Sequence, residues 1–285
     1  MKKYAVIDIG SNSVRLMLWA DGALYKKVET TRLSEGLSES GVLSEAAMQR
    51  SERAVAAFCE EGRRAGAQPV AFATAAVRSA SNGGEFCARV RALCGLDIDV
   101  VAGEDEAQMG LLGALGANDG AVIDIGGAST EVGIRARGVI CFLRSLPIGA
   151  VRIREVCGQS FGMIDAFVDM ALRGFRTIGT FETCYAIGGT AATLASMQER
   201  LPVYDAQKLN GLELSREFVK EAAIRIFMTP LEARKDIPGM DPRRVDIILG
   251  GAVLLFKLME RMHISSVRFS DADNLEGYLA LRGLV

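Results

Sequence analysis

The amino-acid sequence predicts an α/β protein built from two related halves that share a polar cleft. Six residues, AVIDIG, occur at positions 5–10 and again, unchanged, at positions 121–126. In both copies, small residues with hydroxyl or amide side chains follow within three positions. Strand and helix patterns alternate after an opening run of strands, which is typical of the α/β class. Because only two copies of the repeat are found, paired half-domains are favoured over a solenoid.

The first half opens with three strands and continues with alternating helices and strands. An apolar run predicts a buried first strand, and Asp21-Gly22 predicts a hairpin turn between the next two. Two further apolar runs each follow a predicted helix. The predicted strands cover residues 4–9, 14–19, 23–31, 69–74 and 96–101.

Three helices of this half are predicted from their terminal signals. Ser44 can cap a helix that Gly66 ends. Asn82, with Glu85 three residues later, predicts a capping box at the start of the second helix. The third helix is expected at residues 103–115, where a glycine opens it and three acidic residues form its first turn.

A polar link at residues 117–120 separates the halves, and the second half repeats the plan of the first. A third glycine turn, at residues 188–190, directly follows a buried strand and opens a helix. Ser215 and Pro242 are expected to begin two later helices. The strands are predicted at 121–125, 130–135, 139–146, 184–187 and 267–270, and the other helices near 150, 164 and 274.

The charge balance and the apolar stretches exclude several classes of function. The chain has 33 basic and 35 acidic residues, so no overall field attracts nucleic acid or an anionic membrane. The N-terminal apolar run contains Asp8, unlike a signal peptide, and the apolar stretch at 247–259 is too short to span a bilayer. We therefore expect a cytoplasmic protein with no nucleic-acid and no membrane partner.

Histidine and cysteine usage narrows the chemistry further. His263 is the only histidine in the sequence, so a multi-histidine zinc site is excluded. Its place between an apolar helix and a strand predicts a structural connector. The six cysteines contain no C-x-x-C pair, which predicts free thiols in a reducing compartment.

Each AVIDIG copy places an aspartate within a strand and a glycine turn directly after it. Buried carboxylates are costly unless they are paired or bind a metal, so Asp8 and Asp124 predict one shared cleft. Both are candidate ligands for Mg²⁺, with Mn²⁺ as the alternative metal. The glycines let a phosphate reach backbone N–H groups. The predicted phosphate-binding residues are Ser11, Asn12, Ser13, Gly126, Gly127, Ser129, Gly188, Gly189 and Thr190.

Alternative interpretations of these residues stay open. Asp8 and Asp124 could simply cap turns of ordinary hairpins. Glu106, in the first turn of its helix, could position or deprotonate an attacking water, but an acidic residue there also stabilises the helix dipole. Arg78 follows a strand in a loop, where a guanidinium can grip a phosphate in bidentate fashion. A solvated surface arginine is the alternative for Arg78.

Six motifs together resemble the exopolyphosphatase and guanosine pentaphosphate phosphohydrolase (Ppx/GppA) family in its short, two-domain form. This family is part of the actin-like ATPase superfamily. The motifs span nearly the whole chain and read IDIGSNSVRL, ATAAVRSASN, AGEDEAQMGLLGAL, VIDIGGASTEV, AIGGTAATLA and RRVDIILGGAVLL. The resemblance implies two ribonuclease-H-like domains around a central cleft, at residues 1–117 and 118–273. It also implies a C-terminal helix at 274–285 that packs back on the first domain.

The resemblance further implies a metal-assisted hydrolysis of a terminal phosphoanhydride. In the family's motif, the base that activates water is the acidic residue just before an alanine, which here is Glu106. Asp124 and Glu131 carry over from the second phosphate-loop motif as catalytic residues. Arg78 carries over as the arginine that grips a phosphate.

The chain departs from the family pattern at two places. Ala128 stands where the second phosphate loop has a third glycine. Near the C-terminus, SDADNLEG at 270–277, which includes Asn274, stands where S-x-x-G-L-R-E-G is usual.

Four functions remain to be distinguished. The leading hypothesis is an exopolyphosphatase that releases phosphate from the ends of inorganic polyphosphate. The second keeps the chemistry and takes guanosine pentaphosphate (pppGpp), which it converts to ppGpp. The others are a non-hydrolytic nucleotide- or phosphate-binding regulatory module and a sugar or acetate kinase. A homodimer is one alternative for the assembly.

Overall fold

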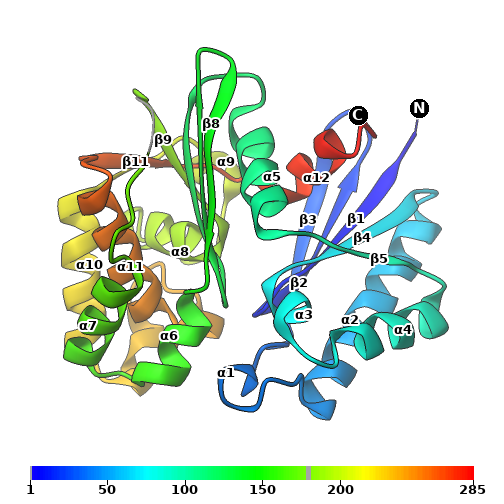
Figure 1. Ribbon diagram of the computed structural model, residues 1–285, viewed down its shortest axis with the longest axis horizontal. Helices are drawn as coiled ribbons and strands as arrows, with labels where there is room; N and C mark the ends of the chain where they lie inside the picture. The colour runs from blue at the N-terminus through cyan, green and yellow to red at the C-terminus, as the bar shows by residue number, and fades with distance from the viewer. Residues whose placement is uncertain (1, 178–180) are drawn as a thin grey trace.

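The computed structural model describes residues 2–177 and 181–285, which form two mixed β-sheets with helices around them (Figure 1). The first sheet has five strands in the order β3-β2-β1-β4-β5. The second has six strands in the order β10-β11-β9-β6-β7-β8. Each sheet contains an antiparallel meander of three strands that continues into parallel strands. The predicted α/β class with two related halves is confirmed.

The two AVIDIG copies form matching central strands, β1 and β6. Each pairs with an antiparallel strand on one side and a parallel strand on the other, so both are buried along their whole length. The first sheet consists of β1 (Tyr4–Ile9), β2 (Ser13–Trp19), β3 (Ala23–Thr30), β4 (Gln68–Ala73) and β5 (Ile98–Val100). The second consists of β6 (Gly120–Ile125), β7 (Thr130–Ala136), β8 (Val139–Leu146), β9 (Cys184–Ile187), β10 (Glu213–Ser215) and β11 (Ser266–Phe269).

Several helices begin where the sequence signals place them. The Ser44 hydroxyl accepts a hydrogen bond from the N–H of Ala47, three residues into α2 (Glu45–Arg64), at 3.3 Å. Ser215 caps α10 (Arg216–Met228) in the same way. Such caps satisfy N–H groups that have no partner within the helix. The remaining α-helices of four residues or more, apart from those introduced below, are α1 (Leu37–Ser40), α6 (Ala150–Cys157), α7 (Phe161–Ala171) and α9 (Ala206–Leu209).

The expected capping box at Asn82 is wrong. Asn82 precedes α4 (Gly83–Cys94), but its side chain makes no capping hydrogen bond. Its amide instead pairs with the backbone of Leu43, accepting from the N–H at 2.8 Å and donating to the C=O at 2.9 Å. A long-range partner therefore competes successfully with the local cap.

Two other local expectations also differ from the structure. Pro242 begins a short 3₁₀ turn, and the apolar helix α11 (Ile248–Arg261) starts six residues later. Arg78 lies in a short helix, α3 (Ala75–Ser79), and not in a loop. A second 3₁₀ segment spans Leu231–Asp236.

Helices α5 (Gly103–Leu115) and α12 (Asn274–Leu281) lie between the two sheets (Figure 1). Helix α5 packs on β6, β7 and β8, whereas α12 packs on α5 and β1. The two helices approach closely at glycines, because a Cβ on Gly113 would overlap the backbone oxygen of Asp273 and one on Gly277 would overlap that of Met109. The division into domains at residue 117 stays a prediction; α5, which it assigns to the first domain, packs on the second sheet.

Three expectations from composition can be compared with the structure. Within the described residues, no helix combines the length and apolarity needed to cross a membrane. Five cysteines, Cys59, Cys87, Cys94, Cys157 and Cys184, are free thiols, as expected. His263 occupies a left-handed turn (φ 57°) between α11 and β11, which agrees with its predicted role as a connector.

Candidate active site

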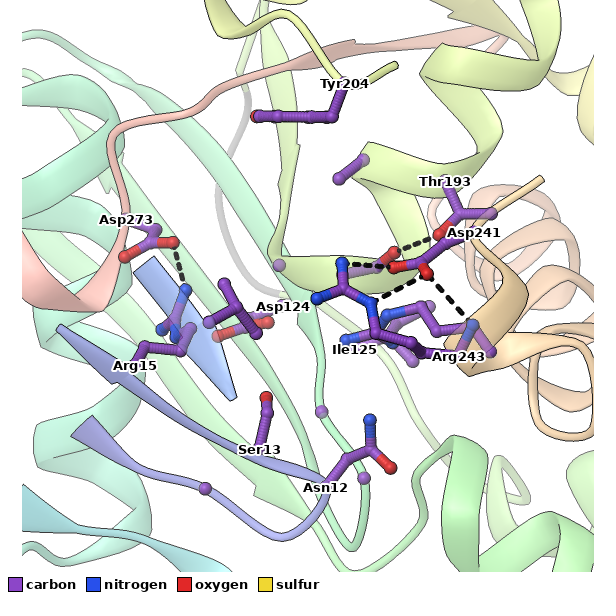
Figure 2. Close-up of a pocket in the computed structure, with 18 of the residues that line it drawn as sticks. Asn12, Ser13, Arg15, Asp124, Ile125, Thr193, Tyr204, Asp241, Arg243 and Asp273 are labelled. Atoms are coloured by element: carbon purple, nitrogen blue, oxygen red, sulfur yellow. Dashed lines mark hydrogen bonds and ion pairs between the residues drawn. The ribbon is translucent and has the colours of Figure 1, made fainter. Parts of the chain in front are cut away.

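A cavity of about 460 Å³ is lined by residues of both halves, at the ends of the matching central strands (Figure 2). Most of the predicted site residues meet there, although they come from distant parts of the chain. Three predicted residues, Arg78, Glu131 and Thr190, do not line it. The predicted residues that line the cavity are Asp8, Ser11, Asn12, Ser13, Glu106, Asp124, Gly126, Gly127, Ser129, Gly188 and Gly189.

The two turns after the repeated strands have the same geometry. The Gly10 N–H donates to the C=O of Ser13 at 3.0 Å, and the Gly126 N–H donates to that of Ser129 at 3.0 Å. The turns also contact each other, because a Cβ on Gly127 would lie only 2.8 Å from the Cβ of Ser11. Glycine is therefore required at position 127 for the two turns to form one continuous cavity wall.

The third glycine turn brings the start of α8 (Gly188–Gln198) to the same cavity. Gly188 adopts φ 78°, a conformation that favours glycine, and α8 has no side-chain cap. The uncapped N–H groups of such a helix start favour an anion. Thr190, the third residue of this turn, does not line the cavity. Its side chain packs against Gly251, and its buried hydroxyl has no hydrogen-bond partner in the described parts of the chain.

Asp8 is held by Arg15, its direct cross-strand neighbour on β2. Arg15 donates from Nε and Nη2 to Oδ2 of Asp8 at 2.8 and 2.6 Å, and from Nη1 to Oδ2 of Asp273 at 2.5 Å. Burial raises the pKa of Asp8, and the positive charge of Arg15 opposes that rise. Oδ1 of Asp8 stays buried without a hydrogen-bond partner among residues 2–177 and 181–285.

Asp124, the matching aspartate, is held by Asn274. The Asn274 Nδ2 donates to Oδ2 of Asp124 at 2.7 Å, which leaves Oδ1 beside the backbone of Gly188. Burial raises the pKa of Asp124 to about 6, while the charge of Arg15 lowers it. Among the residues that the structure describes, each aspartate thus has one carboxylate oxygen that accepts no side-chain hydrogen bond.

Glu106 lies in the first turn of α5 and is buried in the cavity wall. Burial raises its pKa to about 8; the Arg78 charge lowers the pKa, and Asp124 and Asp8 raise it. Arg78 donates from Nη1 to Oε2 of Glu106 at 3.2 Å and to the C=O of Val101 at 2.7 Å. Arg78 therefore orients Glu106, and the structure does not place it in the cavity lining as a direct phosphate ligand.

Glu131 lies deeper than the sequence suggests. It is the cross-strand neighbour of Asp124 on β7, and Ser145 donates a hydrogen bond to its Oε1 at 2.7 Å. Burial and the charges of Glu106 and Asp124 raise its pKa well above the ordinary value. Because Glu131 does not line the cavity, its geometry fits a supporting role behind the cavity wall.

The cavity also carries cations that the sequence interpretation did not single out. Arg243 is paired with Asp241, and Arg15 with Asp273, on opposite sides of the pocket in Figure 2. The guanidinium of Arg244 lies over Gly189 and makes no hydrogen bond or ion pair with any residue that the structure describes. A guanidinium whose N–H groups have no partner in the protein, placed in a polar cavity, is suited to bind an anionic ligand.

A divalent cation fits the donor set that Asp8 and Asp124 present. In the described ranges, no group of three or more His, Cys, Asp or Glu side chains is arranged to hold a metal. Mg²⁺ does not need such a group, because it is commonly held by one or two carboxylates together with water and phosphate oxygens. A cation would give the unpaired Oδ1 of Asp8 a partner. It would also offset the burial that raises the pKa of both aspartates, to which the negative charge of Asp273 adds.

Arg15, Arg244, Asp273 and Asn274 are among the cavity residues that could not be identified as site residues from the sequence patterns used. Arg15 is seven positions after Asp8, at the point where the second copy has Glu131, so comparing the copies beyond AVIDIG could have revealed it. Asp273 and Asn274 lie at the start of the last helix and reach the site only through the tertiary fold. The motif RRVDIILGG identified the segment that contains Arg244, but it did not identify Arg244 as a site residue.

Comparisons with known proteins agree with this arrangement. The profile of the Ppx/GppA phosphatase family matches residues 20–281. Exopolyphosphatase 2 of Mycobacterium tuberculosis is 28% identical, and the alignment covers 99% of each chain. The guanosine-5'-triphosphate,3'-diphosphate pyrophosphatase of Photobacterium profundum is 29% identical over 96% of this chain, which spans only 58% of that protein.

A solved structure shows the same architecture over the whole chain. The Aquifex aeolicus member of the Ppx/GppA family superposes with a TM-score of 0.82 at 27% identity, covering 99% of this chain and 98% of that one. The predicted fold class, two ribonuclease-H-like halves around a cleft, is therefore confirmed.

Proposed function

The chain belongs to the Ppx/GppA phosphatase family, and on that premise we propose that it hydrolyses the terminal phosphoanhydride bond of inorganic polyphosphate. The observation that carries this proposal is the position of Glu106. It is a buried carboxylate in the wall of a cavity whose other walls are glycine turns suited to phosphate. The relative from Mycobacterium tuberculosis, matched over its full length, supports polyphosphate as the substrate.

The residues of the cavity can perform the reaction without a covalent nucleophile. Phosphoryl transfer depends mostly on positioning and on neutralising charge. The turns after β1 and β6 and the start of α8 would bind the terminal phosphates through N–H groups. Glu106, oriented by Arg78, would take the proton of the attacking water. Arg244 would neutralise charge on the phosphate chain.

The proposal includes a divalent metal, Mg²⁺ with Mn²⁺ as the alternative. Asp8 and Asp124 would hold it through their free oxygens, with water and substrate completing the shell. When bound, such an ion neutralises charge on the transferring phosphoryl group. The substrate alternatives, a cytoplasmic location and a homodimeric assembly belong to this proposal as well.

A second substrate is supported by a specific relative. The Photobacterium profundum protein is named for its action on guanosine 5'-triphosphate,3'-diphosphate, and residues of this chain align with 58% of its length. We therefore keep hydrolysis of pppGpp to ppGpp as the second candidate activity.

Phosphate release from the two substrates tests the proposal. Purified protein with Mg²⁺ is incubated with polyphosphate or with pppGpp, and inorganic phosphate is measured over time. Faster release from polyphosphate supports the first candidate, and faster release from pppGpp supports the second. Release from neither substrate contradicts both, and transfer to an added sugar or acetate instead of water indicates a kinase.

The Glu106→Ala variant distinguishes an enzyme from a binding module. Loss of a positioned acid–base group should lower the rate at least about a hundredfold while the protein stays folded. A small loss would favour a module that binds phosphate without productive hydrolysis.

A further inference from the structure

Arg15 is a cation of the cavity whose hydrogen-bonding capacity is largely used inside the protein. Its side chain lines the cavity, and Nε and Nη2 both donate to Asp8. Nη1, the remaining nitrogen, donates to Oδ2 of Asp273 at 2.5 Å. These three bonds use three of the five N–H groups of Arg15, so a phosphate that enters the cavity can use only the remaining N–H of Nη1 or of Nη2.

Asp273 belongs to an acidic strap, residues 271–276, which comprises the end of the loop after β11 and the first turn of α12. The strap also forms ion pairs with a second cation of the cavity, Lys26. Its Nζ lies 2.8 Å from Oε1 of Glu276 and 3.3 Å from Oδ2 of Asp271. Its carboxylates thus take the places on Arg15 and Lys26 that an anionic ligand would use. Figure 2 shows Asp273 pointing into the pocket toward Arg15.

The strap is fixed in this position by the start of α12. Oδ1 of Asp273 accepts a hydrogen bond from the N–H of Leu275, and the Asp273 N–H donates to Glu276, which together form a capping box. The backbone oxygen of Asp273 lies against Gly113 of α5. The carboxylate therefore has one oxygen committed to the helix and the other committed to Arg15.

We propose that Asp273 is a specificity-determining residue that competes with substrate phosphate for Arg15 and so weakens the binding of phosphate chains. The proposal rests on the proposed phosphohydrolase function. With Asp273 present, a phosphate oxygen that reaches Nη1 either displaces this buried carboxylate or shares the nitrogen with its negative charge.

Calorimetric titration of tripolyphosphate in the presence of EDTA tests the proposal, because binding is then measured without metal-assisted turnover. Asp273→Asn and Asp273→Ser both remove the charge and retain a residue that caps helices well. Each should bind tripolyphosphate at least about tenfold more tightly than the wild type, as expected for freeing a charge-assisted donor. Unchanged or weaker binding in both folded variants would overturn the proposal.

Two matched variants separate this effect from others. Asp236→Asn removes the same charge from an exposed residue outside the cavity lining, and it should leave the affinity unchanged. Equal tightening in Asp236→Asn would overturn the proposal, because total charge would explain the result. In the double variant Arg15→Gln/Asp273→Asn the gain should disappear, and a gain that persists would also overturn it.

The same proteins tested for phosphate release keep the two proposals apart. If the wild type releases no phosphate with Mg²⁺ but Asp273→Asn binds tripolyphosphate more tightly, the proposed function fails while the role of Asp273 stands. If the wild type hydrolyses polyphosphate and the affinities are equal, the role of Asp273 fails alone.

Discussion

Replacing Glu106 by glutamine should abolish most activity and at the same time stabilise the ligand-free protein. Glu106 is buried, and its pKa rises from 4.5 to about 8 on folding. The folded state therefore binds the proton more tightly than the unfolded state does, so this group stabilises the fold less and less as the pH rises from 4.5 to 8. Glutamine does not titrate in this range, so the substitution removes the loss of stability with rising pH. Its side-chain oxygen can still accept a hydrogen bond from Arg78.

The size of the effect follows from the shift in pKa. At pH 7, 2.5 units above the unfolded pKa of 4.5, the wild type is less stable by about 3 kcal/mol, because each unit corresponds to about 1.4 kcal/mol. Near pH 5 the same loss is only about 1 kcal/mol, and by pH 9 it approaches about 5 kcal/mol. The advantage of Glu106→Gln should therefore grow steadily across this range.

Urea unfolding at pH 5, 7 and 9 measures the advantage directly. Comparing its pH dependence cancels any constant effect of the amide, since that effect is the same at every pH. The control is Glu104→Gln, an exposed acid in the same first turn of α5, which should change the unfolding free energy by no more than a few tenths of a kcal/mol at any pH. A difference between Glu106→Gln and the wild type that does not grow with pH would refute the reasoning.

Three further predictions concern the same cavity. Activity should rise with pH as Glu106 ionises, with a midpoint between about pH 6 and pH 8, because the proposed cation would lower this pKa from about 8. A flat profile of kcat/KM between pH 6 and 9 would contradict its role as base. Asn274→Leu, close in volume, removes the hydrogen bond to Asp124 and should slow phosphate release about tenfold or more with the fold retained, as near-ultraviolet circular dichroism can confirm. Gly188→Ala would place a Cβ 2.5 Å from Oδ1 of Asp124 and should lower both activity and stability. The control is Gly211→Ala, at φ 85° in open space, which should lower only the stability, by about 1 kcal/mol. Equal losses of activity in the two variants would contradict an effect of the clash with Asp124.

The parts of the site that repeat along the chain could be predicted from sequence. Asp8 and Asp124 were found because each interrupts an apolar strand, and buried strands leave a recognisable continuous apolar pattern. The glycine turns that follow were found for the same reason. The local sequence pattern and the local geometry agree at these positions, so tertiary contacts did not alter the predicted strands and turns.

The partners of these aspartates could not be predicted in the same way. Asn274 is 150 residues from Asp124, and Asp273 is 258 residues from Arg15. No spacing rule relates residues so far apart, because only the packing of α12 against α5 and β1 brings them together. Asn82 shows the opposite failure. Its local sequence pattern predicts a capping box, but its side chain forms hydrogen bonds with Leu43, which is distant in the sequence.

The position of α12 has a consequence for the order in which the protein can fold. Leu275, Tyr278 and Leu279 cover one face of the first sheet, where they pack with Tyr4 and Val6 of β1. Strand β1 is thus covered by a helix that lies far later in the sequence, so this apolar face of β1 stays uncovered until about residue 279 has been synthesised. Arg15 receives Asp273, and Asp124 receives Asn274, only when α12 docks. A growing chain therefore contains the turns after β1 and β6 before it contains a completed cavity.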